Sequence, residues 1–401
     1  MESGITRPML SHQYQIAILG RTHGKVARLK RVLAQQADDL GLDRKAIRFL
    51  DHSTIETRDK KAPLVAVFFG YWGAQDTAHP YLMHLVQESV VILPVFDTSM
   101  RVGDYIPASI SHINAVNEGA LDHRFSMLGN YILEALRLLR QTRRLFISYR
   151  RMEAQTIAIQ LYECLDARGF DVFLDTHSVP PGEPFQDVLW HRLADTDVVV
   201  LLDTPDFLDS QWTQEELAHA NTTNVQILQV IWPGNSTPAA SVFSRFYMLQ
   251  AASFTGSKQI GRKARLKTKP LRDIAAEVES LRARALAARH AYLVNSFCKE
   301  ATKLCLAPTF SSNKIIDVEI GGTGNVLSVI AAVGVPDAHL YQEMEEHFAS
   351  GGVKPAKIWL LYDERGIRKR WLEHLSWLDG YATIKSVRVS RCYDELKKLV
   401  P

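Results

Sequence analysis

Along this chain, short runs of apolar residues alternate with segments in which apolar residues recur at helical spacing. Near the start, Tyr14-Gln15-Ile16-Ala17-Ile18-Leu19-Gly20 reads as a strand closed by glycine, and residues 25–40 follow with a helical pattern. Further strands are predicted at 46–50, 64–69 and 90–96. The run at 90–96 is nearly continuously apolar, which is typical of parallel strands covered on both faces. A helix is predicted at 127–139. The first block is therefore expected to be α/β.

The second block shows the clearest alternation. A strand at 145–148 leads into a helix at 153–168, where Gly169 provides the C-terminal stop. The prolines and glycine of residues 175–184 predict a loop. The remaining elements are strands at 171–174, 198–202 and 227–231 and helices at 185–194 and 212–220. Right-handed crossovers would wrap these elements into a doubly wound, flavodoxin-like parallel sheet.

The third block is again α/β. Its strands are predicted at 326–333, 358–362 and 384–389, with a helix at 367–378. A polar, Gly/Ser/Lys-rich stretch and a long Ala/Arg/Leu-rich helix, at about 271–306, come before it. The sequence thus predicts a central flavodoxin-like sheet flanked by two further α/β domains. The expected parts are an N-terminal domain at 1–140, a central domain at 141–250, a linker at 251–270 and a C-terminal domain at 271–401.

Composition changes this picture little. The chain is 46% hydrophobic and 23% charged, and its net charge of +3 is too small to suggest a nucleic-acid binder. The most basic segment, Lys258 to Lys269, is expected to be a solvated part of the linker. No apolar run reaches membrane-spanning length, no signal peptide is recognisable, and the four scattered cysteines are expected to be reduced. We therefore expect a cytoplasmic protein.

Candidate chemistry gathers in two motifs of the second block. The strand Leu145-Phe146-Ile147-Ser148 ends abruptly in Tyr149, Arg150 and Arg151. About sixty residues later, Trp212 and Glu216 stand four positions apart, which is one face of a helix. Both motifs should lie at the carboxyl edge of one parallel sheet, where α/β folds bind ligands. The sequence therefore favours an enzyme site with a nucleotide ligand.

The second block resembles a TIR (Toll/interleukin-1 receptor) domain over about residues 143–232. Three motifs carry this resemblance, in the family's order: Phe146-Ile147-Ser148-Tyr149 with Arg150-Arg151, the loop from Asp175 through Gly182 to Phe185, and Ser210-Gln211-Trp212 with Glu216-Leu217. Two positions depart from the family pattern. Thr213 replaces the usual cysteine, and Asp203-Thr204 stands where many members carry serine. The N-terminal block is similar in general layout and is expected to be a degenerate relative.

The resemblance implies an NAD-cleaving enzyme of the prokaryotic type, active in anti-phage defence through NAD depletion or a cyclic ADP-ribose signal. Catalytic members keep a glutamate at the position of Glu216. The residues that the resemblance and their chemistry assign to substrate binding are Ser148, Tyr149, Arg150, Arg151, Asp175, Gly182 and Trp212. NAD would be a substrate, with no cofactor and no metal. Expected partners are further copies of the chain, through TIR domains, and a protein trigger; neither a membrane nor a nucleic acid is expected.

Other interpretations stay open. Trp212 is also consistent with a core position, Arg151 with a surface salt bridge, and Asp175 with anchoring its own loop. Ser148 is consistent with a hydrogen bonder at the strand end. The rival function is a non-catalytic TIR scaffold that recruits partners through residues 175–185. Three histidines of the first block, His79, His84 and His112, lack metal-ligand spacing and are expected to be ordinary residues.

Overall fold

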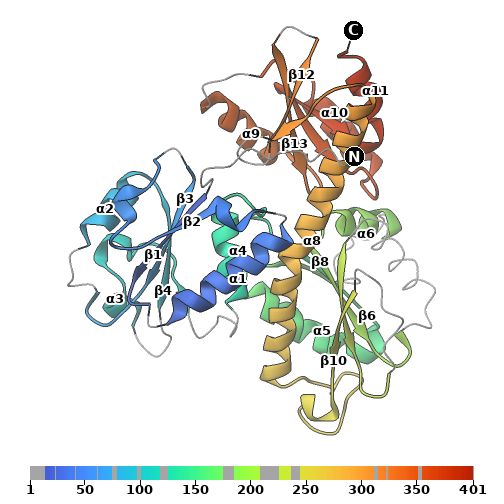
Figure 1. The fold of residues 1–401 in the computed structure, drawn as a ribbon. Coiled ribbons are helices and arrows are strands. Elements are labelled where there is room, and N and C mark those ends of the chain that lie inside the picture. Colours follow the sequence, from blue (N-terminus) through green and yellow to red (C-terminus); the bar gives the residue numbers. More distant parts are fainter. Residues whose placement is uncertain are drawn as a thin grey trace, which may run out of the picture. The chain divides into compact units, whose positions relative to one another are not determined.

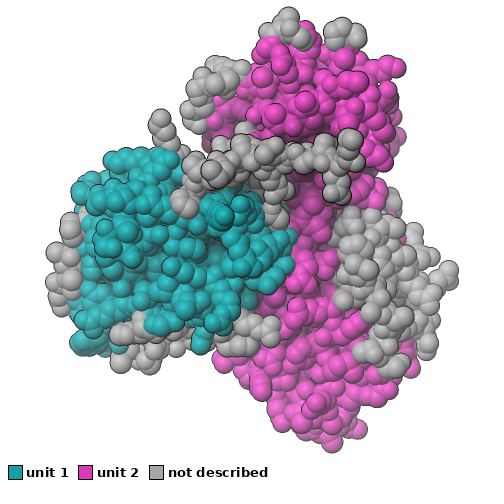
Figure 2. All heavy atoms as spheres, viewed as in Figure 1, with its two compact units in different colours: residues 1–141 teal, residues 142–401 magenta. Residues whose placement is uncertain are grey.

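The computed structural model separates the chain into two compact units, residues 1–141 and 142–401 (Figure 2). Each contains α/β architecture, as the sequence predicts. No helix among the described residues is long and apolar enough to cross a membrane. The structure describes residues 14–22, 24–40, 42–60, 62–74, 79–96, 101–117, 125–174, 185–207, 225–235, 244–310, 315–321, 324–350 and 355–400.

The first unit contains a sheet of five parallel strands in the order β2-β1-β3-β4-β5. The strands are β1 (Tyr14–Gly20), β2 (Ile47–Leu50), β3 (Leu64–Phe69), β4 (Val91–Phe96) and β5 (Val116–Asn117). The helices are α1 (Lys25–Asp39), α2 (Pro80–Gln87), α3 (Val102–Tyr105) and α4 (Ser126–Ala135). Every residue of β3 after Leu64 is buried, as expected for a strand covered on both faces. In β4, for which the same was predicted, Val91 is 46% exposed, so this strand is only partly covered.

The central sheet lies in the second unit and also has five parallel strands, in the order β7-β6-β8-β9-β10 (Figure 1). The strands are β6 (Arg144–Tyr149), β7 (Asp171–Leu174), β8 (Val198–Asp203), β9 (Gln226–Ile231) and β10 (Ser244–Met248). Helices α5 (Arg151–Asp166) and α6 (Phe185–Ala194) follow β6 and β7 along the chain. In chain order this is 2-1-3-4-5, so the flavodoxin-like prediction is confirmed.

A third sheet is mixed, in the order β11-β12-β13-β14-β15. An antiparallel part, β11 (Thr309–Phe310), β12 (Ile315–Ile320) and β13 (Asn325–Ala332), continues into parallel pairing with β14 (Lys357–Tyr362) and β15 (Ile384–Arg388). The sequence patterns predicted β13, β14 and β15. They missed β5 in the first unit, β10 in the central sheet, and β11 and β12 here. The helices of this part are α9 (Ala338–Ser350), α10 (Lys369–Leu378) and α11 (Cys392–Lys397).

Residues 251–270, expected to be a linker, pack closely against the central sheet. Phe254, Ala264 and Leu266 belong to the same buried core as Ile147. The backbone of this segment also bonds to α5, where the Oγ1–H of Thr156 donates to a carbonyl oxygen in the segment. All six Lys and Arg side chains between residues 258 and 269 are exposed. The domain boundaries drawn from the sequence stay predictions.

One long helix, α8 (Thr268–Lys303), runs from the central sheet to the third sheet (Figure 1). It contacts the turn before β8, where Arg289 donates to the backbone carbonyls of Thr196 and Ala194. Its Glu279 pairs with Arg143, just before β6, at 2.9 Å. These contacts fix α8 to the amino edge of the central sheet. The opposite, carboxyl edge is therefore not covered by these contacts.

Candidate active site

The candidate site is the carboxyl edge of the central sheet. Because β6, β8 and β9 are parallel, they end at this same edge, and Asp203 at the end of β8 pairs in register with Ile231. After β6 the chain moves to β7 on one side and then returns to β8 on the other. Ligands of doubly wound folds bind where the strand order reverses in this way. The edge between β6 and β8 is therefore the expected crevice.

Two of the predicted residues at this edge are buried. Ser148 is 2% exposed and Tyr149 is 4% exposed, at the end of β6. The Tyr149 side chain belongs to a core cluster with Ala154 and Ile157 of α5. In this conformation both side chains support the strand end rather than lie open at the edge.

Arg150 bridges the ends of β6 and β8. Its Nη1 lies 2.9 Å from a carboxylate oxygen of Asp206 and 3.5 Å from one of Glu153, and it donates to the backbone oxygen of Asp206 at 3.1 Å. The arginine side chain is 44% exposed, so the guanidinium reaches solvent at the strand edge. Its charge is compensated here by two carboxylates. Arg151, the first residue of α5, is exposed.

A buried carboxyl group at the end of β8 was not among the predicted site residues. Asp203 is 1% exposed and accepts hydrogen bonds from the side-chain amides of Gln229 at 3.0 Å and Asn235 at 3.3 Å. Burial raises the pKa of Asp203, while these two amide donors lower it. The signal was present in the sequence, because the run Val198 to Leu202 ends abruptly in two polar residues.

The next residue, Thr204, is fully buried. Among the described residues its Oγ1 has no hydrogen-bond partner. A buried hydroxyl without a partner is costly, so this atom marks a place where a further group would be stabilising.

Four of the predicted site residues lie outside the described residues: Asp175, Gly182, Trp212 and Glu216. Strand β7 ends at Leu174, one residue before Asp175. The structure therefore gives the scaffold of the edge and the positions of Ser148, Tyr149, Arg150 and Arg151. Within the described ranges, no group of three or more His, Cys, Asp or Glu side chains is placed to hold a metal ion.

Helix α6, which follows the predicted loop at 175–184, is tied to the third sheet. The Asp195 carboxylate, just after α6, accepts the backbone N–H of Val335 at 3.0 Å. The ring of His191 lies 5.4 Å from the ring of Trp371 in α10. Burial, helped by nearby arginines, lowers the pKa of His191 to about 4, so this imidazole is neutral at physiological pH.

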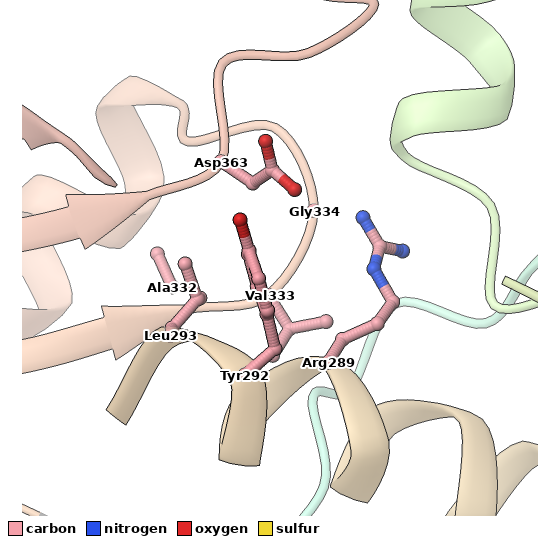
Figure 3. A pocket seen from close by; sticks show the side chains of 7 residues that line it. All are labelled: Arg289, Tyr292, Leu293, Ala332, Val333, Gly334 and Asp363. Carbon is pink, nitrogen blue, oxygen red and sulfur yellow. The ribbon is translucent and has the colours of Figure 1, made fainter. Parts of the chain in front are cut away.

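A small cavity lies where α8 meets the carboxyl ends of β13 and β14. Figure 3 shows the Tyr292 hydroxyl pointing toward the Asp363 carboxyl group, with the Arg289 side chain beside them. The cavity contains about 210 Å³ of empty space, part of it open solvent. Ligand pockets usually measure roughly 300 to 1,000 Å³, so this cavity is too small for a nucleotide. Its lining residues are Arg289, Tyr292, Leu293, Ala332, Val333, Gly334 and Asp363.

Comparison with known proteins finds a family match in the central part of the chain. Residues 145–263 match the family model described as "TIR domain". No curated protein matches the sequence. The match covers the central sheet from β6 onward and includes part of the segment that follows β10.

Several solved structures align over much of the chain at low similarity. The C-terminal domain of glucosamine-fructose-6-phosphate aminotransferase from Francisella tularensis is 9% identical, with 69% of this chain and 83% of that chain covered and a TM-score of 0.20. Tagatose-6-phosphate ketose/aldose isomerase from Escherichia coli is 12% identical, with 70% and 83% covered and a TM-score of 0.19. A periplasmic ribose ABC transporter from Conexibacter woesei is 11% identical, with 56% and 74% covered and a TM-score of 0.17. These TM-scores are too low to support any inference about this chain.

Proposed function

We propose that the TIR domain, which occupies residues 145–263, cleaves the bond between nicotinamide and ribose in NAD, with Glu216 as the essential carboxylate. One observation carries the proposal. The family match spans Glu216, the position at which the resemblance to NAD-cleaving members implies the catalytic glutamate. The flavodoxin-like strand order supports it, because it provides a reversal point at the edge where the matching motifs end.

The chemistry suits a single carboxylate. When the bond to nicotinamide breaks, the ribose develops an oxocarbenium-like positive charge and the pyridine leaves as a neutral molecule. No proton has to be delivered to the leaving group. A preorganised carboxylate beside the developing charge stabilises the transition state electrostatically. Glu216 would have this role, and Trp212, four residues earlier in the sequence, would stack on a ring of the substrate.

Arg150 is the proposed contact for the pyrophosphate. Its planar fork matches phosphate oxygens, and its partly exposed side chain stands at the β6 end of the edge. To bind phosphate, the guanidinium would exchange the carboxylate of Asp206 for the ligand. The pair is half exposed, so the exchange costs little, on the order of 1 kcal/mol. The buried hydroxyl of Thr204 and the amide-bound Asp203 are then the polar groups beneath this part of the site.

A second function, without catalysis, is compatible with the contacts at this edge. Tyr149 is buried in the core, and Arg150 is already paired with Asp206 and Glu153. Neither arrangement is required for catalysis, and both are compatible with a TIR scaffold that recruits partners through residues 175–185. In that case Glu216 would be an ordinary helix residue, and the protein would leave NAD intact.

The two functions are separated by incubating NAD with the concentrated, full-length protein and measuring free nicotinamide by chromatography. Nicotinamide release supports the enzyme, and the co-product distinguishes hydrolysis, which yields ADP-ribose, from cyclisation. Unchanged NAD at high protein concentration supports the scaffold. Within the enzymatic proposal, the biological role would be prokaryotic anti-phage defence by NAD depletion or by a cyclic ADP-ribose signal, in homo-oligomers joined through TIR domains.

A further inference from the structure

The first unit repeats the strand order of the TIR domain. Its sheet runs β2-β1-β3-β4-β5, so its reversal point lies between β1 and β3. The two strand ends approach closely there. Gly20, the last residue of β1, has a φ of +80°, and a Cβ on it would lie 2.0 Å from the backbone oxygen of Phe69. The backbone N–H of Arg21 then donates to that same oxygen at 3.0 Å. Only glycine permits this closeness.

A cluster of polar aromatic residues lies at this reversal point. The two ring nitrogens of His79 are 2.8 Å from the hydroxyl of Tyr81 and 3.2 Å from the hydroxyl of Tyr71. His52, which follows β2, accepts the backbone N–H of Gly20 at 3.2 Å, and its ring meets that of Tyr81 edge-on. Residues from three separate segments of the chain therefore converge on the ends of β1 and β3. From the sequence, His79 was expected to be an ordinary residue.

The pKa shifts of His79 and Tyr81 both favour the neutral forms of these side chains. Burial, with a contribution from His52, lowers the pKa of His79, and burial raises that of Tyr81 to about 12. The carboxylate of Asp51, the residue before His52, is hydrogen-bonded within its own turn. It accepts hydrogen bonds from the hydroxyl groups and backbone N–H groups of Ser53 and Thr54. These bonds lower the pKa of Asp51 to about 2.

A cation contacts this cluster, and an exposed ring belongs to the residue that follows Tyr71 in the sequence. The Arg21 guanidinium lies 4.6 Å from the centre of the Tyr71 ring, and within the described part of the chain no carboxylate is within ion-pair distance of it. Trp72, the next residue after Tyr71, is 65% exposed and meets Tyr105 edge-on. A large exposed ring contributes little to the fold. It is, however, what a ligand with a planar base would stack on.

We propose that the carboxyl edge of the first unit's sheet binds a nucleotide, with the base stacked on Trp72 and the phosphate held by Arg21. The hydroxyl groups of Tyr71 and Tyr81, linked through His79, would bond to the sugar. Three features support the site: the strand reversal, the hydrogen-bonded Tyr71–His79–Tyr81 group with the Arg21 guanidinium over the Tyr71 ring, and the exposed ring of Trp72, the residue after Tyr71 in the sequence. This inference does not depend on NAD cleavage by the TIR domain.

The test is isothermal titration calorimetry of the full-length protein with AMP, which has no nicotinamide bond to cleave. Arg21→Ala and Trp72→Ala should each raise the Kd for AMP about tenfold or more. Two matched controls should stay within about twofold of wild type. Lys60→Ala removes a cation whose side chain is 75% exposed, before β3 at the opposite edge of the same sheet. Trp377→Ala removes a tryptophan that is 58% exposed in the other unit.

Three results would overturn the proposal. The first is the absence of measurable AMP binding to the wild-type protein. The second is an unchanged Kd in both Arg21→Ala and Trp72→Ala while their thermal unfolding matches wild type. The third is loss of AMP binding in Arg150→Ala, which would assign the binding to the TIR domain. If Arg21→Ala fails to fold, Tyr71→Phe keeps the ring beneath Arg21 and removes only the hydroxyl that contacts His79. It should still weaken AMP binding, and wild-type affinity in that variant contradicts the site.

Discussion

Arg282 of α8 donates its Nε–H to a carboxylate oxygen of Asp197 at 2.7 Å, and neither side chain is exposed. Asp197 stands immediately before β8, at the amino edge of the central sheet. A buried ion pair of this kind contributes little net stability relative to apolar residues, but breaking it leaves a buried charge without a partner. The pair therefore fixes where α8 docks, on the side of the sheet away from the candidate site.

Replacing Arg282 by methionine should lower the free energy of unfolding by about 3–5 kcal/mol, because Asp197 stays buried without its cation. Chemical denaturation followed by tryptophan fluorescence measures the change. The double variant Arg282→Met/Asp197→Leu should recover most of the loss. Lys303→Met, on the same helix, removes a cation from an exposed pair and should change stability by less than about 1 kcal/mol. A double variant as unstable as the single one would refute this account of the pair.

If Arg150 contacts the pyrophosphate, Arg150→Ala should raise the KM for NAD by roughly tenfold with a smaller change in kcat, as for a lost binding contact. Asp206→Asn should lower the KM, because it frees the guanidinium from a competing carboxylate. Steady-state kinetics measures both. Arg245→Ala is the control, since Arg245 lies in β10 and pairs with Glu277. An equal rise in KM in that variant would indicate a general charge effect instead.

His191 should make stability depend on pH. Its folded pKa of about 4 lies below the usual value of 6.5, so the unfolded chain binds more protons between these two values. Stability should therefore rise as the pH increases from about 4 to about 6.5, by less than about 1.4 kcal/mol per pH unit. His191→Gln should flatten this rise in denaturation curves measured across the range. An identical slope in the variant and the wild type would show that other groups cause it.

Homo-oligomers joined through TIR domains should make NAD cleavage cooperative in protein concentration. The resemblance to catalytic TIR domains implies that a loop of one domain completes the site of its neighbour. Specific activity should therefore fall on serial dilution and recover on addition of a crowding agent. The measurement is the initial rate of nicotinamide release per mole of protein. A constant specific activity down to dilute monomer would exclude a shared site.

Hydrophobic pattern predicted most of the two parallel sheets, because covered parallel strands are long apolar runs between helical segments. It missed β12, although Ile315-Ile316-Asp317-Val318-Glu319-Ile320 alternates along most of its length. It also suggested that residues 251–270 form a linker. Their basic side chains are indeed exposed, whereas Phe254, Ala264 and Leu266 enter the core. Only three-dimensional packing reveals which few residues of a polar segment are buried.

Less of the candidate site than of the fold could be predicted from the sequence. The motif after β6 indicated the edge and its arginines, but not that Arg150 pairs with Asp206 or that Tyr149 is buried. Those contacts join residues far apart in the sequence or depend on how a strand end packs. The buried Asp203, held by two amides from later in the chain, escaped for the same reason.

The measurement that tests the central proposal most directly compares three proteins: wild type, Glu216→Gln and Glu215→Gln. Each is incubated at high concentration with NAD, and free nicotinamide is measured by chromatography. The neighbouring glutamate is a matched control, because both variants lose one carboxylate and keep nearly the same shape. The proposal predicts that Glu216→Gln lowers the rate by about a hundredfold to a thousandfold while Glu215→Gln stays close to wild type. Equal nicotinamide release by all three, or none from wild type, would contradict it.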